Sequence, residues 1–234
     1  MRGPPRLRRG GGWGDLHHFR GRQPPLPLVP QEIERLATAS PSKAYLNKQF
    51  TPDVLLERAA DPAVRQVHVA THADFLPGGP SESKLYTGTA PVSLERFASV
   101  QEQRQCQFLD LFVLSACRTA LGDRDSELGF AGLALQAGSR SAIGSLWYVD
   151  DVATSAFFVQ FYHFLHQGLP KAEAMKATRR LFASGGVRLE GDRLLGENGK
   201  ELLADLSPLQ QELASHGMHH PYFWSGITLL GAPW

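Results

Sequence analysis

A histidine and a cysteine each follow directly on a predicted core strand. His72 ends the segment from His68 to His72, and Cys117 follows the apolar run that closes with Ala116. Catalytic groups in open parallel sheets gather at the carboxyl ends of strands, so neighbouring strands would bring both side chains to one site. A thiolate is a strong nucleophile, and an adjacent imidazole can carry its proton. The pair predicts covalent catalysis, although position alone leaves open that the cysteine is inert core packing.

The other reactive side chains form weaker patterns. Cys106 precedes a predicted strand and is interpreted as structural. His216, His219 and His220 are close in sequence, but no cysteine or acid cluster completes a four-ligand set, so no metal is expected. The sequence has no GxxxxGK[ST] loop to hold phosphates, which argues against a nucleotide-dependent enzyme. No cofactor is expected.

The elements that would position the histidine and the cysteine alternate between strand and helix patterns from Leu26 onward. This alternation predicts an α/β fold with a largely parallel sheet and helices on both faces. The stretch 185–217 is more polar and is interpreted as an insertion that carries one short helix from Pro208. The predicted strands are 64–71, 108–115, 141–146 and 223–230, and the longer predicted helices are 52–60, 93–103, 127–137, 151–167 and 170–183.

Five segments resemble, in chain order, the motifs of CHAT domains. These domains are relatives of caspase-like cysteine peptidases and often occur beside TPR repeats. The resemblance covers residues 26–234, and it rests on the order of all five motifs, since any one would be weak. The motifs are HVATH at 68–72, SACRTALG at 115–122, GFAGLA at 129–134, GSLWYVDD at 144–151 and HPYFW at 220–224.

The resemblance implies a caspase-like fold with a Cys/His dyad. Carried onto this sequence, Cys117 is the nucleophile and His72 is its acid/base partner. The backbone N–H groups of Ala73 and Cys117 would form the oxyanion hole. The family usually has glycine after the histidine, and here the alanine Cβ is expected to restrict both the backbone and the approach of substrate.

The predicted function is a cysteine endopeptidase that cleaves protein or peptide substrates. The main alternative, motivated by Ala73 and by the absence of TPR-like repeats, is a catalytically inactive caspase-like interaction module. A third interpretation is a cysteine hydrolase that acts on a non-peptide amide or ester. Asp150 and Asp151 follow the strand 141–146 and could bind a basic substrate side chain, or they could serve as helix caps. A TPR-containing protein is a further expected partner, as a regulator.

The amino-acid composition limits the class of protein to which the chain can belong. The chain has 234 residues, of which 42% are hydrophobic and 20% charged, as in ordinary globular domains. No apolar run approaches the roughly 18 residues that span a bilayer, and two cysteines cannot make a disulfide framework, so a cytoplasmic protein with no membrane partner is expected. Residues 1–25 hold six arginines against one aspartate and are predicted to form a disordered tail, ahead of one domain at 26–234. No specific nucleic-acid partner is expected for this tail.

Overall fold

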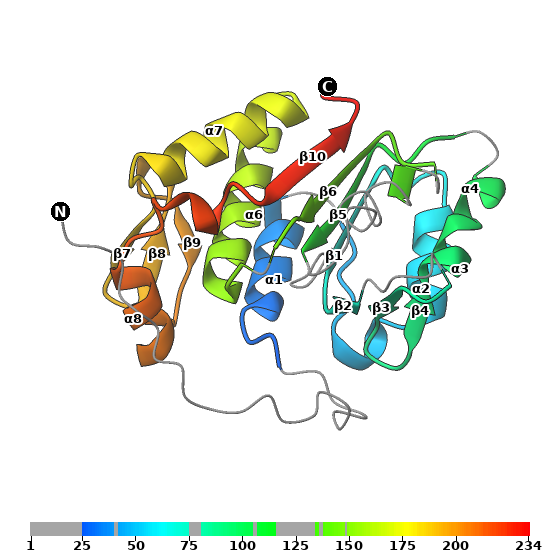
Figure 1. The fold of residues 1–234 in the computed structure, drawn as a ribbon, viewed down its shortest axis with the longest axis horizontal. Coiled ribbons are helices and arrows are strands. Elements are labelled where there is room, and N and C mark those ends of the chain that lie inside the picture. Colours follow the sequence, from blue (N-terminus) through cyan, green and yellow to red (C-terminus); the bar gives the residue numbers. More distant parts are fainter. Residues whose placement is uncertain are drawn as a thin grey trace.

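The central sheet has four strands, and three of them are parallel. The computed structural model describes residues 25–39, 42–74, 81–104, 107–115, 134–135, 138–147 and 149–234 (Figure 1). In the sheet order β1-β5-β6-β10, β1 and β6 both pair with β5 in parallel, and β10 is antiparallel to β6. The predicted α/β class with a mostly parallel sheet is therefore confirmed. The strand bounds are Gln66–Ala70 for β1, Leu111–Ser115 for β5, Ser141–Ser145 for β6 and Ile227–Gly231 for β10.

Helices cover both faces of this sheet (Figure 1). All five residues of β5 are buried, and its four apolar residues alternate between two cores. Leu111 and Val113 pack in the core of α6 and α7, whereas Phe112 and Leu114 pack in the core of α2, α3 and α4. This is the pattern of a strand buried on both sides. On the first face lie α1 (Val29–Ala39), α6 (Asp151–His166) and α7 (Lys171–Ala183); on the second lie α2 (Pro52–Ala60), α3 (Leu94–Ala98) and α4 (Val100–Gln103).

Side-chain caps fix where several helices begin. Thr51 accepts the Val54 N–H at 3.2 Å and opens α2, as its sequence predicts. Ser207 forms a capping box with Gln210 and opens α8 (Pro208–Ser215). The predicted helix 93–103 is instead two short helices, because the chain turns at Ser99, whose hydroxyl donates to the Arg96 carbonyl at 2.8 Å.

Two small antiparallel sheets flank the central one and were not predicted. The first follows β1 directly, and the second lies within 185–217, where it packs Leu194, Leu202 and Leu203 against the core of α6. Their strands have two or three residues, too few to show an alternating pattern. The strands are β2 (Ala73–Asp74), β3 (Lys84–Tyr86) and β4 (Pro91–Ser93), then β7 (Arg188–Glu190), β8 (Arg193–Leu195) and β9 (Glu201–Leu203); the 3-10 turns are η1 (Asn47–Gln49), η2 (Glu197–Gly199) and η3 (Pro221–Phe223).

The predicted start of the last strand differs from the structure. The last strand begins at Ile227 rather than 223, because Pro221–Phe223 forms η3, in which His220 accepts the Tyr222 N–H. Most of the predicted helix 127–137 and of the predicted tail 1–25 lie outside the described residues. Gly138, where that helix was expected to end, has a φ of 84° and donates its N–H to the Leu135 carbonyl at 3.0 Å.

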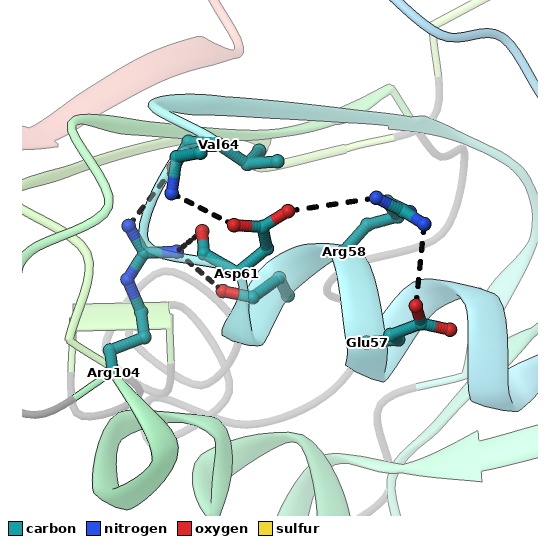
Figure 2. Close-up of polar contacts among 7 residues, drawn as sticks. Glu57, Arg58, Asp61, Val64 and Arg104 are labelled. Atoms are coloured by element: carbon teal, nitrogen blue, oxygen red, sulfur yellow. Dashed lines mark hydrogen bonds and ion pairs between the residues drawn. The ribbon is translucent and has the colours of Figure 1, made fainter.

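A buried arginine joins α4 to the segment between α2 and β1. Arg104 is 1% exposed, and its guanidinium donates to the carbonyls of Ala59 (2.6 Å), Asp61 (2.9 Å) and Val64 (2.9 Å). Figure 2 shows the side chain directed at this turn, beside the ion pair of Arg58 with Asp61. The same guanidinium also reaches the carbonyls of Gln107 and Phe108, which precede β5. Arg104 thus fixes the segments that enter both β1 and β5.

Candidate active site

The predicted site depends on β1 and β5 being neighbours, and they are. The strands pair in parallel up to Ala70 and Ser115, and the Thr71 N–H continues the ladder by donating to the Ser115 carbonyl at 3.2 Å. His72 is two residues beyond Ala70, at the carboxyl edge of the sheet. Cys117 is two residues beyond Ser115 in the sequence, and it lies outside the described residues, as does Cys106.

The backbone on both sides of His72 is held by Tyr86 of β3. The His72 carbonyl accepts the Tyr86 N–H at 2.9 Å, and the Thr71 hydroxyl donates to the Tyr86 carbonyl. The Tyr86 hydroxyl donates to Asp74 Oδ2 at 2.7 Å. The half-buried His72 is therefore placed by two ladders, β5 on one side and β3 on the other. Tyr86 could not be predicted from the sequence, because its strand of three residues is too short to show a pattern.

The amide of Ala73 points away from β3. Ala73 pairs with Leu85, and the bond from the Tyr86 N–H to the His72 carbonyl marks this as a non-hydrogen-bonded antiparallel pair. In such a pair, the N–H and carbonyl groups of both residues face outward from the ladder. β2 is the edge strand of its sheet, so the Ala73 N–H is directed off that edge.

Alanine fits the position after His72 without backbone strain. Ala73 is not among the described residues with positive φ, so its conformation does not require glycine. Its methyl group is 1% exposed and packs in the core of α2, α3 and α4. The alanine Cβ therefore fills core volume, and the expected restriction of the backbone does not arise.

Asp150 and Asp151 each hold a backbone amide. Asp150 Oδ1 accepts the Ala153 N–H at 3.0 Å and caps α6, which confirms the predicted cap. Asp151 Oδ2 accepts the Leu28 N–H at 3.1 Å, just before α1. Burial raises the pKa of both carboxyls, that of Asp151 to about 6. For Asp151 the Leu28 N–H opposes this rise in pKa, whereas the charges of Glu32 and Asp150 add to it.

A buried polar cluster beside Asp151 ties α1 to β1 and α6. Glu32 is 1% exposed, and its two carboxylate oxygens meet His68 Nε2 and Ser155 Oγ, each at 2.8 Å. The His68 ring packs edge-on against Phe158 and Tyr162, with centroid distances of 5.2 and 5.5 Å. Burial, and then the charge of Glu32, raise the pKa of the Tyr162 hydroxyl. Of the two histidines in the segment 68–72, the first therefore has structural partners in the core.

The raised pKa of Asp151 predicts a pH-dependent stability. An unfolded aspartate titrates near pH 4, so between about pH 4 and 6 the folded chain binds more protons than the unfolded chain, and stability falls as pH rises through this window. Asp151→Asn keeps an acceptor for Leu28 and removes the buried charge. We expect urea unfolding at pH 7.5 to show this variant about 1–2 kcal/mol more stable than wild type, after allowance for partial exposure.

The gain in the free energy of unfolding of Asp151→Asn should shrink to near zero at pH 4. Asp53→Asn, at an aspartate whose side chain is 87% exposed, is the matched control and should show no such change between the two pH values. A gain that is equal at both pH values would show that the charge of Asp151 is not the cause.

Segments far apart in the sequence meet beside β6. Trp147 follows β6, stacks on Tyr222 with a centroid distance of 6.4 Å and donates its Nε1–H to the Tyr222 carbonyl at 2.9 Å. The Leu146 N–H donates to the Gly226 carbonyl at 2.9 Å. A Cβ at Gly226 would lie 2.5 Å from the Trp147 ring, so this position requires glycine. Trp147 and Leu146 therefore hold the segment after β6 against the segment before β10.

Within the described ranges, no group of three His, Cys, Asp or Glu side chains lies close enough together to hold a metal ion. His216 and His220, two of the histidines considered as ligands, contact backbone groups: His216 Nδ1 lies 2.7 Å from the Glu212 carbonyl, and His220 Nδ1 accepts the Tyr222 N–H at 3.3 Å. Every helix within the same ranges is too short or too polar to span a membrane.

Fold and site together define an α/β protein whose mostly parallel sheet carries a histidine at its carboxyl edge, next to the strand that leads to a cysteine. The model of the CHAT domain family matches residues 15–232. The chain therefore belongs to the CHAT family, whose members are related to caspase-like cysteine peptidases. A comparison with curated proteins gives no match.

Proposed function

We propose that this chain is a cysteine peptidase with a caspase-like fold, in which Cys117 is the nucleophile and His72 is the acid/base. The observation that carries the proposal is the parallel register of β1 and β5. Ala70 pairs with Ser115, and His72 and Cys117 each follow that pair by two residues. Adjacent strands are about 4.8 Å apart, so equal offsets favour a hydrogen bond between imidazole and sulfur.

The reaction follows from these roles. His72 takes the proton of the Cys117 thiol, the thiolate attacks the peptide carbonyl carbon, and the N–H groups of Ala73 and Cys117 stabilise the oxyanion. His72 protonates the leaving amine as the C–N bond breaks, which leaves a thioester. Water, deprotonated by His72, then attacks the thioester and releases the acid and the thiol. The outward direction of the Ala73 amide supports its part, because that N–H is not used in the ladder with β3.

The substrate side chain and the partners remain predictions. Asp150 and Asp151 stand beside the same edge and would favour arginine or lysine before the scissile bond. Both carboxylates already accept a backbone N–H, so a substrate contact has to use their remaining lone pairs. A TPR-containing regulator and a cytoplasmic location follow from the family resemblance and the two-cysteine composition.

Selective alkylation tests the dyad without knowledge of the substrate. Iodoacetamide at low concentration near pH 7 should modify Cys117 before Cys106, because a neighbouring imidazole raises the thiolate fraction. We expect His72→Ala to slow modification of Cys117 by about tenfold or more. Both cysteines lie on the tryptic peptide 105–118, so fragmentation of that peptide by tandem mass spectrometry gives the rate at each cysteine.

His216→Ala, at an exposed histidine on the end of α8, is the matched control and should leave both rates unchanged. Preferential modification of Cys106, or equal rates for Cys117 with and without His72, would contradict the proposal and would favour an inactive interaction module.

A further inference from the structure

The amino ends of the central strands carry two exposed arginines on one level of the sheet. β1 and β6 lie on either side of β5, and Val67 and Ala142 both pair with Phe112. The residues that precede β1 and β6 are therefore level with each other, one on each side of β5. These residues are Arg65 and Arg140, and both are exposed. In parallel strands the amino ends lie opposite the carboxyl ends, so the two arginines and His72 lie at opposite edges of the sheet.

A hollow of about 290 Å³ lies between these arginines. It is lined by Pro62, Arg65, Gln107, Phe108 and Arg140. Phe108 is 50% exposed, which is unusual for a large apolar side chain, and the Arg140 guanidinium lies 5.4 Å from the centre of its ring. The hollow therefore combines two guanidinium groups with an accessible aromatic face.

The positive charge of this hollow is not neutralised within the described part of the chain. There, neither Arg65 nor Arg140 forms an ion pair, and the nearby acids have other partners. Asp110 Oδ1 lies 3.3 Å from Lys171 Nζ, and Asp61 lies 3.6 Å from Arg58. Burial lowers the pKa of Arg104, the charge of Asp61 raises it and the charge of Arg65 lowers it, so a further cation lies close to Arg65.

We propose that this hollow binds an acidic segment of a partner protein, with carboxylates on Arg65 and Arg140 and an apolar side chain against Phe108. Guanidinium groups bind carboxylates through two parallel hydrogen bonds, and arginine beside an aromatic residue is a common composition at the centres of protein interfaces. A nucleic acid would need more cations along its backbone, since each phosphate contact adds little by itself. A partner bound here leaves the edge that carries His72 open.

Peptide binding tests the assignment on the full chain. The probe is a fluorescein-labelled decapeptide that alternates glutamate with leucine and phenylalanine, and its counterpart has glutamine at every glutamate. We expect fluorescence anisotropy to show saturable binding of the acidic peptide and at least tenfold weaker binding of the glutamine peptide. Arg65→Gln and Arg140→Gln should each weaken binding about fivefold, and Phe108→Ser by a similar factor. Arg180→Gln removes an exposed arginine on α7 and should leave affinity unchanged.

Four outcomes would overturn the proposal. One is equal binding of the two peptides, which would show that the carboxylates are not recognised. The second is an equal loss of affinity in Arg180→Gln, and the third is no binding at about 1 mM peptide. The fourth is displacement of the peptide by an equal concentration of inorganic triphosphate or a single-stranded oligonucleotide, which would assign the site to phosphate instead.

Discussion

Replacing Cys117 or His72 with alanine is expected to abolish peptide hydrolysis, with a loss of roughly 10³-fold or more in kcat. The two side chains act as one unit in the proposed reaction, so the double variant should be hardly slower than either single one. A pool of fluorogenic peptides with every amino acid before the scissile bond supplies the substrate, and circular dichroism monitors the fold. His72 is half-buried, and its backbone is held by β3 and β5, so the alanine variants should fold as wild type does.

Cys106→Ser and His216→Ala are the matched controls and should keep the wild-type rate. If a Cys117→Ala variant of an active preparation retains its rate, Cys117 is not the nucleophile. If only His72→Ala retains its rate, the acid/base lies elsewhere.

The sequence predicts β5 and β6 well because both strands are buried along their whole length between two layers of helices. The run before His72 is only partly buried in β1, and all three runs form parallel strands. Caps at Thr51, Asp150 and Ser207 are local signals and fix the starts of their helices. The neighbouring order of β1 and β5 also follows, since sequential strands usually lie side by side.

The surroundings of the site could not be predicted, because they depend on contacts between distant segments. Tyr86 contacts residues on both sides of His72 from a strand of three residues. Glu32 is an unremarkable acid on an amphipathic helix, and only its burial against His68 and Ser155 shows its role. Ala73 is expected from the sequence to restrict the backbone, and only its φ and its buried side chain show that it does not.

Arg104 lies in a segment rich in glutamine and charged residues, where nothing in the sequence distinguishes a buried arginine from an exposed one. Its guanidinium binds five carbonyls of the segments that lead into β1 and β5. Burial lowers its pKa, the charge of Asp61 raises it and Arg65 lowers it, and a guanidinium stays charged throughout. The buried charge is therefore stabilised by backbone dipoles rather than by a carboxylate bound to it.

Arg104→Ala is expected to lower the free energy of unfolding by about 3–5 kcal/mol, because it leaves several of these carbonyls without a donor and opens a cavity. In a domain of this size the melting temperature should fall by roughly 8–15 °C. Arg104→Lys should recover part of the loss, since one ammonium group can donate to fewer carbonyls than the planar guanidinium. Arg96→Ala, which breaks an ion pair between two exposed side chains, is the matched control and should lower the free energy of unfolding by no more than about 0.5 kcal/mol.

Arg104 holds the segments that precede β1 and β5, the two strands that lead to His72 and Cys117. We therefore also expect Arg104→Lys to slow alkylation of Cys117. If Arg104→Ala cost no more than the Arg96 control, the guanidinium would not be what holds these segments together.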